Sequence, residues 1–139
     1  METYKHKVHY YETDKMGITH HSNYVRWMEE ARVDYLDKIG WNFARLESMG
    51  IVSPVTGINV SYKSPSTFDE EITIYTSIAE FKGVKLKIKY HMVNSEGKTV
   101  CDAYSEHCFM NLEGGFIRFK KDYPELFEAF VSRVESEEA

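Results

Sequence analysis

A change of hydrophobic period near residue 50 is the feature that most restricts how this chain folds. Before it, apolar side chains recur at helical spacing over residues 24–39. After it, apolar and polar residues alternate in several runs, most clearly over residues 84–92, where lysines fill the second face. One long helix followed by four or five consecutive strands predicts an α+β fold, with a curved antiparallel sheet wrapped around the helix.

The remaining segments fit the same plan. The predicted elements are a strand over 3–11, an ordered loop over 12–21, a short helix over 42–49, a hairpin turn over 94–97, a long strand over 98–112, a further strand over 116–119 and an acidic helix with its tail over 122–139. Ser22 and Asn23 are residue types that commonly cap helices, so they predict where the long helix starts. No repeat or linker interrupts the pattern, which predicts one domain over residues 1–139.

Charge and cysteine content argue against several classes of function. The formal net charge of −5 disfavours a nucleic-acid binder. No apolar run is long enough for a membrane span or a secretory signal, and the charged start is typical of a strand. Cys101 and Cys108 lie seven residues apart in one predicted strand, hence on opposite faces, so no disulfide is expected between them. These features together predict a cytoplasmic protein.

The loop before the long helix carries the residues with the clearest chemical potential. Asp14 supplies a carboxylate, and Gly17 supplies a point where the backbone can approach a ligand. The first turn of the helix, near His21 to Asn23, presents free N–H groups and the positive end of the helix dipole. Attack on a thioester carbonyl needs a nucleophile or base together with donors for the developing oxyanion. A lone aspartate beside a glycine is more often only a turn residue.

A resemblance to a known family strengthens the chemical interpretation. The residues that carry it are Glu12-Thr13-Asp14, Gly17, His21, Asn23-Tyr24, Arg26-Trp27 and Glu29-Glu30-Ala31-Arg32, followed by Tyr62, Pro65 and Asp69. This pattern resembles the signature of the 4-hydroxybenzoyl-CoA thioesterase family. The first segment is the specific part of the match, and the later one is weak by itself.

The resemblance implies a hot-dog fold, in which a long central helix is wrapped by a curved antiparallel sheet. It implies hydrolysis of an acyl-CoA thioester to a carboxylic acid and CoA, without a cofactor. Asp14 matches the family's catalytic aspartate, a nucleophile or a general base depending on the member. His21 matches the position whose backbone N–H helps to form the oxyanion hole, with Gly17, Ser22 and Asn23 as further positioning residues. The family also implies homodimers or homotetramers with active sites at a shared interface.

Several neighbouring side chains are candidates for substrate contact. They are Glu12, His20, Tyr24 and Trp27 near the loop, and Lys85 and Lys87 on the basic strand. Glu12 has a second interpretation as a structural partner of the backbone or of Arg26. The helix residues are core by default, and a lysine-bearing strand face is more often only solvated than bound to CoA phosphates. The His21 imidazole could itself act in acid–base chemistry, although a backbone role does not require it.

Two alternatives to an acyl-CoA hydrolase stay open from the sequence. One is a thioesterase acting on acyl carrier protein, and the other is a non-catalytic acyl-binding protein with the same scaffold. Asp14 argues against the second, since a binder has no need of that carboxylate. Asp14, His20 and His21 could together imitate a metal site, but adjacent histidines rarely converge on one ion, so no metal is expected.

Overall fold

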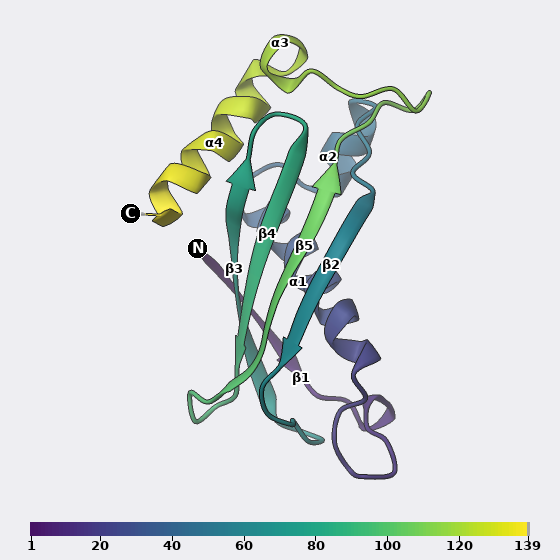
Figure 1. Cartoon of the computed structure of the whole chain (residues 1–139), viewed down its shortest axis with the longest axis vertical. Helices are drawn as coiled ribbons and strands as arrows, with labels where there is room; N and C mark the ends of the chain where they lie inside the picture. The colour runs from purple at the N-terminus through teal and green to yellow at the C-terminus, as the bar shows by residue number, and fades with distance from the viewer. Residues whose placement is uncertain (139) are drawn as a thin grey trace.

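The structure, a computed structural model, describes residues 1–138, so the last residue of the predicted tail, Ala139, lies outside it. The elements in chain order are β1 (Glu2–Lys7), the 3₁₀ helix η1 (Tyr10–Glu12), α1 (Ser22–Lys38), α2 (Phe43–Ser48), β2 (Val55–Tyr62), β3 (Glu71–Phe81), β4 (Lys85–Val93), β5 (Thr99–Cys108), α3 (Phe119–Asp122) and α4 (Pro124–Glu138). The strands form one antiparallel sheet in the order β1-β3-β4-β5-β2 (Figure 1).

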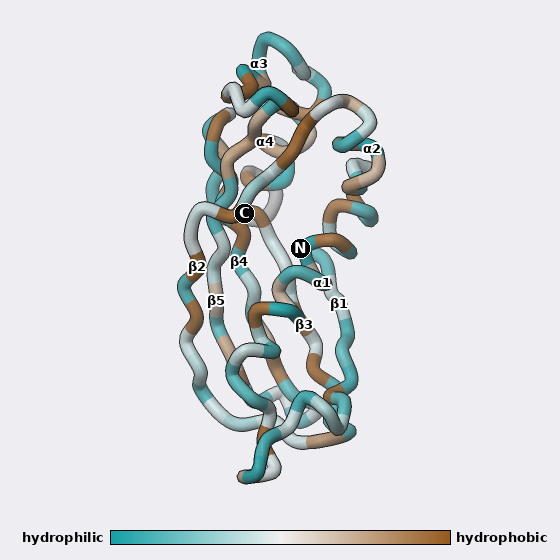
Figure 2. The backbone as a smooth tube through the Cα atoms, turned by 90° about the vertical axis from the view of Figure 1, so that its right-hand side faces the viewer, coloured by the Kyte–Doolittle hydropathy of each residue, from teal (hydrophilic) through white to brown (hydrophobic). Residues whose placement is uncertain are grey.

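The long helix α1 lies along one face of this sheet, as the change of period predicts (Figure 2). Its apolar stripe is buried, and Trp27, Ala31 and Tyr35 have no exposed surface. The sheet contributes the alternate residues of its strands, among them Ile74 and Ile88, which are also fully buried. Burial of these side chains is what holds the helix on the sheet. The predicted α+β architecture of the hot-dog type is therefore confirmed.

The N-terminal segment departs from the predicted strand over 3–11. Strand β1 ends at Lys7, and the chain turns into η1, where Tyr10 and Tyr11 are both 77% exposed. The turn forms because the Glu12 carboxylate folds back and accepts the backbone N–H of His9. A side chain five residues beyond the strand competes there with strand pairing, which alternation alone does not reveal.

The second difference concerns the start of α1. The helix begins at Ser22, and His21 occupies the position before it without a side-chain capping bond. Ser22 and Asn23 are therefore first-turn residues and not caps. Their side chains form other hydrogen bonds in the loop, described below, and this is why they do not cap the helix.

The C-terminal third differs at one predicted strand. Phe116 forms only an isolated bridge with Met110, and Phe119 begins the short helix α3. Phe119 is pulled inward because its ring packs edge-on against Phe109 at 4.5 Å, in an aromatic cluster that includes Phe130. Tertiary packing of these rings outweighs local strand propensity.

Helix α4 follows and packs against β3 at the side of the sheet (Figure 1). Leu126 and Phe130 of this helix are completely buried and extend the core. The predicted C-terminal helix is confirmed for the described residues. Cys101 and Cys108 are buried free thiols. Among the described residues, no helix combines the length and the apolar character that crossing a membrane requires.

Candidate active site

The loop that carries Asp14 is a small closed hairpin. Residues 13–19 pair at their ends, and the N–H of Asp14 donates to the carbonyl of Ile18 at 3.0 Å. The Asp14 carboxylate accepts the N–H of Met16 at 2.8 Å, while its carbonyl accepts the N–H of Gly17. Gly17 has φ +79°, a left-handed backbone that glycine adopts without strain. The glycine is thus needed for the turn, and Asp14 is exposed where the turn begins.

Ser66 anchors this hairpin to the body of the molecule. The N–H and hydroxyl of Thr19 both bond to the Ser66 carbonyl, and the two hydroxyls lie 2.7 Å apart. The Ser66 hydroxyl also lies 2.9 Å from the Tyr24 hydroxyl, and Ser66 has no exposed surface. Sequence reasoning missed Ser66, because a serine in a loop carries no pattern that distinguishes it from a solvated one.

Asn23 ties the hairpin to α1. Its side-chain amide donates to the carbonyls of Glu12 and His20, at 3.0 and 3.2 Å. The N–H of His20 donates to the same Glu12 carbonyl at 2.8 Å. Asn23 is buried, so these bonds are shielded from water and fix the loop relative to the helix. Its role in the structure is to position the loop, not to cap the helix.

The predicted oxyanion donors are not equally available. The N–H of Gly17 is bonded inside the turn, and that of Asn23 donates to the His20 carbonyl at 3.0 Å. The N–H of Ser22 donates to Nδ1 of the His20 ring at 3.3 Å. The N–H of His21, by contrast, donates to no acceptor within the part of the chain that the structure describes. The expectation of several free donors therefore reduces to His21, because the hairpin uses the N–H of Gly17 and His20 accepts those of Ser22 and Asn23.

The two histidines lie at the exposed start of α1. Their rings are 4.3 Å apart, and His20 also meets the Ser22 hydroxyl at 2.9 Å. The hydroxyl of Tyr62, from the end of β2, donates to the His21 carbonyl at 3.3 Å. The edge strand β2 thereby reaches the N-terminus of the helix. Because both imidazoles are exposed, each can meet a bound ligand.

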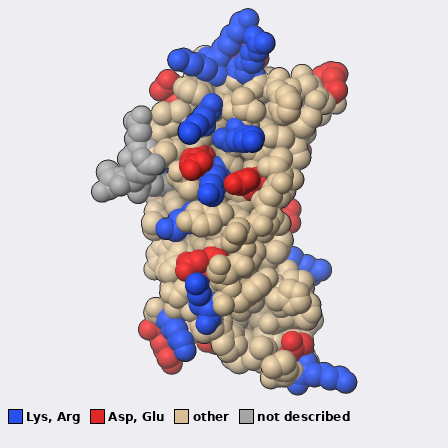
Figure 3. All heavy atoms as spheres, in the orientation of Figure 1, with Lys and Arg blue, Asp and Glu red and all other residues tan. Residues whose placement is uncertain are grey.

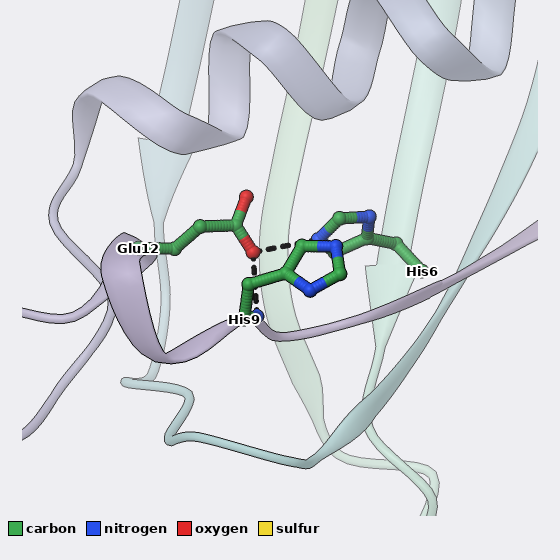
Figure 4. Close-up of side chains that lie close together, drawn as sticks. All are labelled: His6, His9 and Glu12. Atoms are coloured by element: carbon green, nitrogen blue, oxygen red, sulfur yellow. Dashed lines mark hydrogen bonds and ion pairs between the residues drawn. The ribbon is translucent and has the colours of Figure 1, made fainter.

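Glu12, a candidate for substrate contact, is buried instead in a polar clamp (Figure 4). One oxygen accepts Nε2 of His6 at 2.8 Å and the His9 N–H at 2.7 Å, and the other accepts the Trp27 indole N–H at 2.8 Å. Burial opposes ionisation, but these hydrogen bonds outweigh it and lower the pKa of Glu12. Neither Arg26 nor Asp14 takes part. The structural interpretation of Glu12 is the better one: the expected backbone partner is the His9 N–H, while His6 and Trp27 take the place of Arg26.

The same clamp is the one group of potential metal ligands among the described residues. Ligand atoms of His6, His9 and Glu12 lie within 4.8 Å of one another. The Glu12 oxygens, however, already accept three N–H groups, and Nδ1 of His6 faces Glu30 at 3.4 Å. An ion would have to displace these bonds and take a ring nitrogen in its unprotonated form. The geometry suits a hydrogen-bonded clamp better than a metal site.

Tyr24 and Trp27, the two pocket candidates on α1, are enclosed in the core. Trp27 has no exposed surface and Tyr24 has 3%. The indole N–H of Trp27 donates to Glu12, and the hydroxyl of Tyr24 is hydrogen-bonded to that of Ser66. Within one chain both side chains lie in the core, as the default interpretation expects, and they support the loop.

Lys85 and Lys87 lie on the face of the sheet opposite to α1. Figure 3 shows this face, where basic and acidic side chains are interspersed. Lys87 stands opposite Glu80 on one neighbouring strand and opposite Glu106 on the other. Its ammonium also lies 4.6 Å from the centre of the Tyr104 ring. One chain therefore does not bring these lysines together with Asp14.

Comparisons with known proteins agree with this fold and loop. Residues 8–133 match the model of the thioesterase-like superfamily. YneP, a proposed acyl-CoA thioesterase of Bacillus subtilis (strain 168), is 36% identical over 89% of this chain and 91% of its own length. YbgC of Escherichia coli O157:H7, an acyl-CoA thioester hydrolase, is 28% identical over 70% and 72% of the two chains. A DHNA-CoA thioesterase from Staphylococcus aureus superposes with a TM-score of 0.90 at 31% identity, covering 99% of this chain and 94% of that one.

The fold and the match over nearly the whole chain define a thioester hydrolase of the hot-dog type. The chain belongs to the thioesterase-like superfamily, as the residues around Asp14 predict.

Proposed function

We propose that this protein hydrolyses acyl-CoA thioesters and that Asp14 is the catalytic carboxylate. The observation that carries the proposal is the hairpin of residues 13–19, which presents an exposed carboxylate and then leads directly into α1, where the His21 N–H has no internal acceptor among the described residues. The sequence relatives named for acyl-CoA hydrolysis support CoA as the carrier.

Two routes fit this arrangement. In one, Asp14 removes a proton from water, and the resulting hydroxide attacks the thioester carbonyl. In the other, the carboxylate attacks directly, gives a mixed anhydride and releases the CoA thiolate; water then cleaves the anhydride. In both routes the carbonyl oxygen becomes negative, and the His21 N–H stabilises it. The C–S bond breaks, the thiolate takes a proton, and no cofactor is needed.

A homodimer would complete the site. Strand β2 is an edge strand, and its side chains Val55, Ile58 and Tyr62 are 49%, 48% and 49% exposed. An apolar edge of this kind is a template for pairing with a second chain. Because Tyr62 bonds to His21, a partner placed along β2 would lie next to the helix N-terminus and shield the thioester from water.

The proposal is tested by Asp14→Asn. Asparagine can still accept the Met16 N–H, so the turn and the melting temperature should be preserved. Loss of the base or nucleophile should reduce kcat by about 10²- to 10⁴-fold. Thiol release from a panel of aromatic, short and long acyl-CoAs is the assay, and Asp37→Asn, at the exposed end of α1, is the matched control. Full activity of Asp14→Asn would refute the role of Asp14.

A further inference from the structure

A second cluster of polar side chains, separate from the hairpin, lies between α1 and the sheet. Nη1 of Arg32 meets Nδ1 of His107 at 2.7 Å, Nε2 of His107 meets the Ser105 hydroxyl at 2.7 Å, and that hydroxyl meets the Tyr90 hydroxyl at 2.7 Å. All four residues are buried, with exposed fractions of 1% to 8%. Because they come from α1, β4 and β5, only the folded chain brings them together.

The state of His107 follows from its neighbours. Arginine can only donate, so Nδ1 of His107 accepts and the proton of the neutral ring sits on Nε2, from which it is donated to Ser105. Burial and the nearby Arg32 charge lower the pKa of His107 to about 4. The imidazole is therefore neutral near pH 7, and it does not compensate the charge of Arg32.

Arg32 is consequently a buried cation without a carboxylate partner. No carboxylate oxygen lies within 4.0 Å of its guanidinium among the residues described, and His107 supplies its one side-chain hydrogen bond. Its other electrostatic neighbours are Tyr90, the exposed Glu29 and the ring of Phe43, whose centre lies 5.1 Å away. A guanidinium has five N–H groups, and burying it unpaired is costly. An arrangement of this kind leaves N–H groups of Arg32 available to bind an acceptor on a ligand.

A cavity of about 140 Å³ adjoins these groups. Its apolar walls are Val25, Met28, Val55 and Ile58, and its polar residues are Glu29, Arg32, Tyr90, Ser105 and His107. A cavity of about 150 Å³ is large enough to hold a benzene ring. An acyl group that is apolar along its length and polar at its far end would match both kinds of wall.

The position of the cavity relates it to the proposed thioester site. Its lining on α1 runs from Val25 to Arg32, which corresponds to about 10 Å of helix at 1.5 Å per residue. Val25 follows His21 by four residues, about one helical turn. An acyl group whose carbonyl lies at the His21 N–H would therefore extend past Val25 and Met28 and end at Arg32.

We propose that Arg32 is a specificity-determining residue, which selects acyl groups that carry a hydrogen-bond-accepting oxygen at the end remote from the thioester. This inference rests on the proposed acyl-CoA hydrolysis. The oxygen can belong to a hydroxyl on an aromatic ring or to a terminal carboxylate. Both accept N–H groups of the guanidinium, and the ionised carboxylate forms the stronger pair because both partners are charged.

The test compares two pairs of substrates. The aromatic pair is 4-hydroxybenzoyl-CoA and benzoyl-CoA, and the aliphatic pair is adipyl-CoA and hexanoyl-CoA. A hydrogen bond to a charged group contributes about 1.5–3 kcal/mol, so the oxygenated member of at least one pair should have a kcat/KM about 10- to 100-fold higher. Which pair shows the preference identifies the source of the oxygen. In Arg32→Met the ratio should fall to within about 3-fold of one. Arg45→Met, on the surface of α2, should retain the wild-type ratio.

A binding measurement separates this inference from the proposed function. The free acids 4-hydroxybenzoate and benzoate, and adipate and hexanoate, are titrated into the protein, and their binding is followed by NMR. This measurement needs no turnover.

If no acyl-CoA is hydrolysed, the proposed function fails. A preference for the oxygenated acid that disappears in Arg32→Met would still support the cavity assignment. If Arg32→Met does not fold, Arg32→Lys keeps the charge without the planar fork and should lower the preference. Equal binding within both pairs by the wild type, or an unchanged preference in the Arg32 variants, would overturn the inference.

Discussion

The indole N–H of Trp27 donates to the Glu12 carboxylate at 2.8 Å, and this bond joins the loop that leads to Asp14 with the long helix behind it. The other oxygen of Glu12 holds His6 of β1 and the backbone of His9. One buried carboxylate thus connects strand, loop and helix. An exposed loop needs such support to keep a defined shape, because its exposed residues cannot order themselves.

Glu12→Gln should destabilise the fold by about 2–3 kcal/mol, since hydrogen bonds to a charged acceptor are lost and an amide N–H₂ group must face the donors of Trp27 or His6. Urea unfolding at pH 7 measures the effect. Glu113→Gln, in an exposed turn, should stay within about 0.5 kcal/mol of the wild type. Equal stability of the two variants would mean that the clamp contributes little.

Asn23 supports the same loop from the helix side. Asn23→Asp keeps the shape but replaces the N–H donors with an acceptor facing the carbonyls of Glu12 and His20. We expect the loop to shift and kcat/KM for acyl-CoA to fall by at least about 10-fold, because small displacements of catalytic groups are expensive. A hydrogen-exchange comparison should show faster exchange of the Thr19 and His20 amides. Unchanged exchange and activity would contradict a positioning role.

The parts of the fold that the sequence predicts are those governed by repeating burial. The stripe of α1 and the alternation of β4 follow directly from which face meets the core. The end of β1 at Lys7 and the helical turn at Phe119 do not, because each depends on particular side-chain contacts that do not repeat along the chain, with a carboxylate in the first case and an aromatic cluster in the second. Single tertiary contacts leave no period in a sequence.

The same distinction applies to the site. Asp14, Gly17 and His21 are close together in the sequence, so a local motif picks them out as candidates. Arg32 and His107 are 75 residues apart and meet only across the helix–sheet interface. Arg32 belongs to the motif that carries the family resemblance, but as a charged residue on an amphipathic helix it has no sequence signal that marks it as buried.

His107 makes stability depend on pH in a defined window. Its pKa is about 4 in the folded protein against 6.5 for the free side chain, so between these values the unfolded chain binds more protons. Unfolding free energy should therefore rise with pH from 4 to 6.5, by on the order of 3 kcal/mol over the whole interval. The lowered pKa of Glu12 acts in the same direction but below about pH 4.5.

His107→Gln tests this dependence, since glutamine can still accept from Arg32 but does not titrate. The difference in unfolding free energy between pH 6.5 and pH 4.5 should shrink by about 2 kcal/mol relative to the wild type. Chemical denaturation at both pH values is the measurement, and His91→Gln, in a half-exposed pair on the outer face, is the matched control. A variant with the wild-type pH dependence would show that His107 is not the group responsible.

The exposed edge of β2 leads to a last prediction, about assembly. A lysine in place of Val55 puts a charge into an apolar strand edge, which is an established way of preventing strands from pairing. Under the proposed dimer, Val55→Lys should sediment as a monomer at concentrations where the wild type is a dimer. Because Val55 also borders the proposed acyl cavity, a loss of activity would not distinguish loss of the dimer from damage to the cavity. The readout is therefore the mass of the protein, measured by analytical ultracentrifugation across a dilution series.

Thr56→Lys, one residue along, is exposed but polar, so it should weaken pairing less. A wild-type protein that is monomeric and fully active would exclude the shared site, and the hairpin of Asp14 would then have to shield its substrate with residues of its own chain.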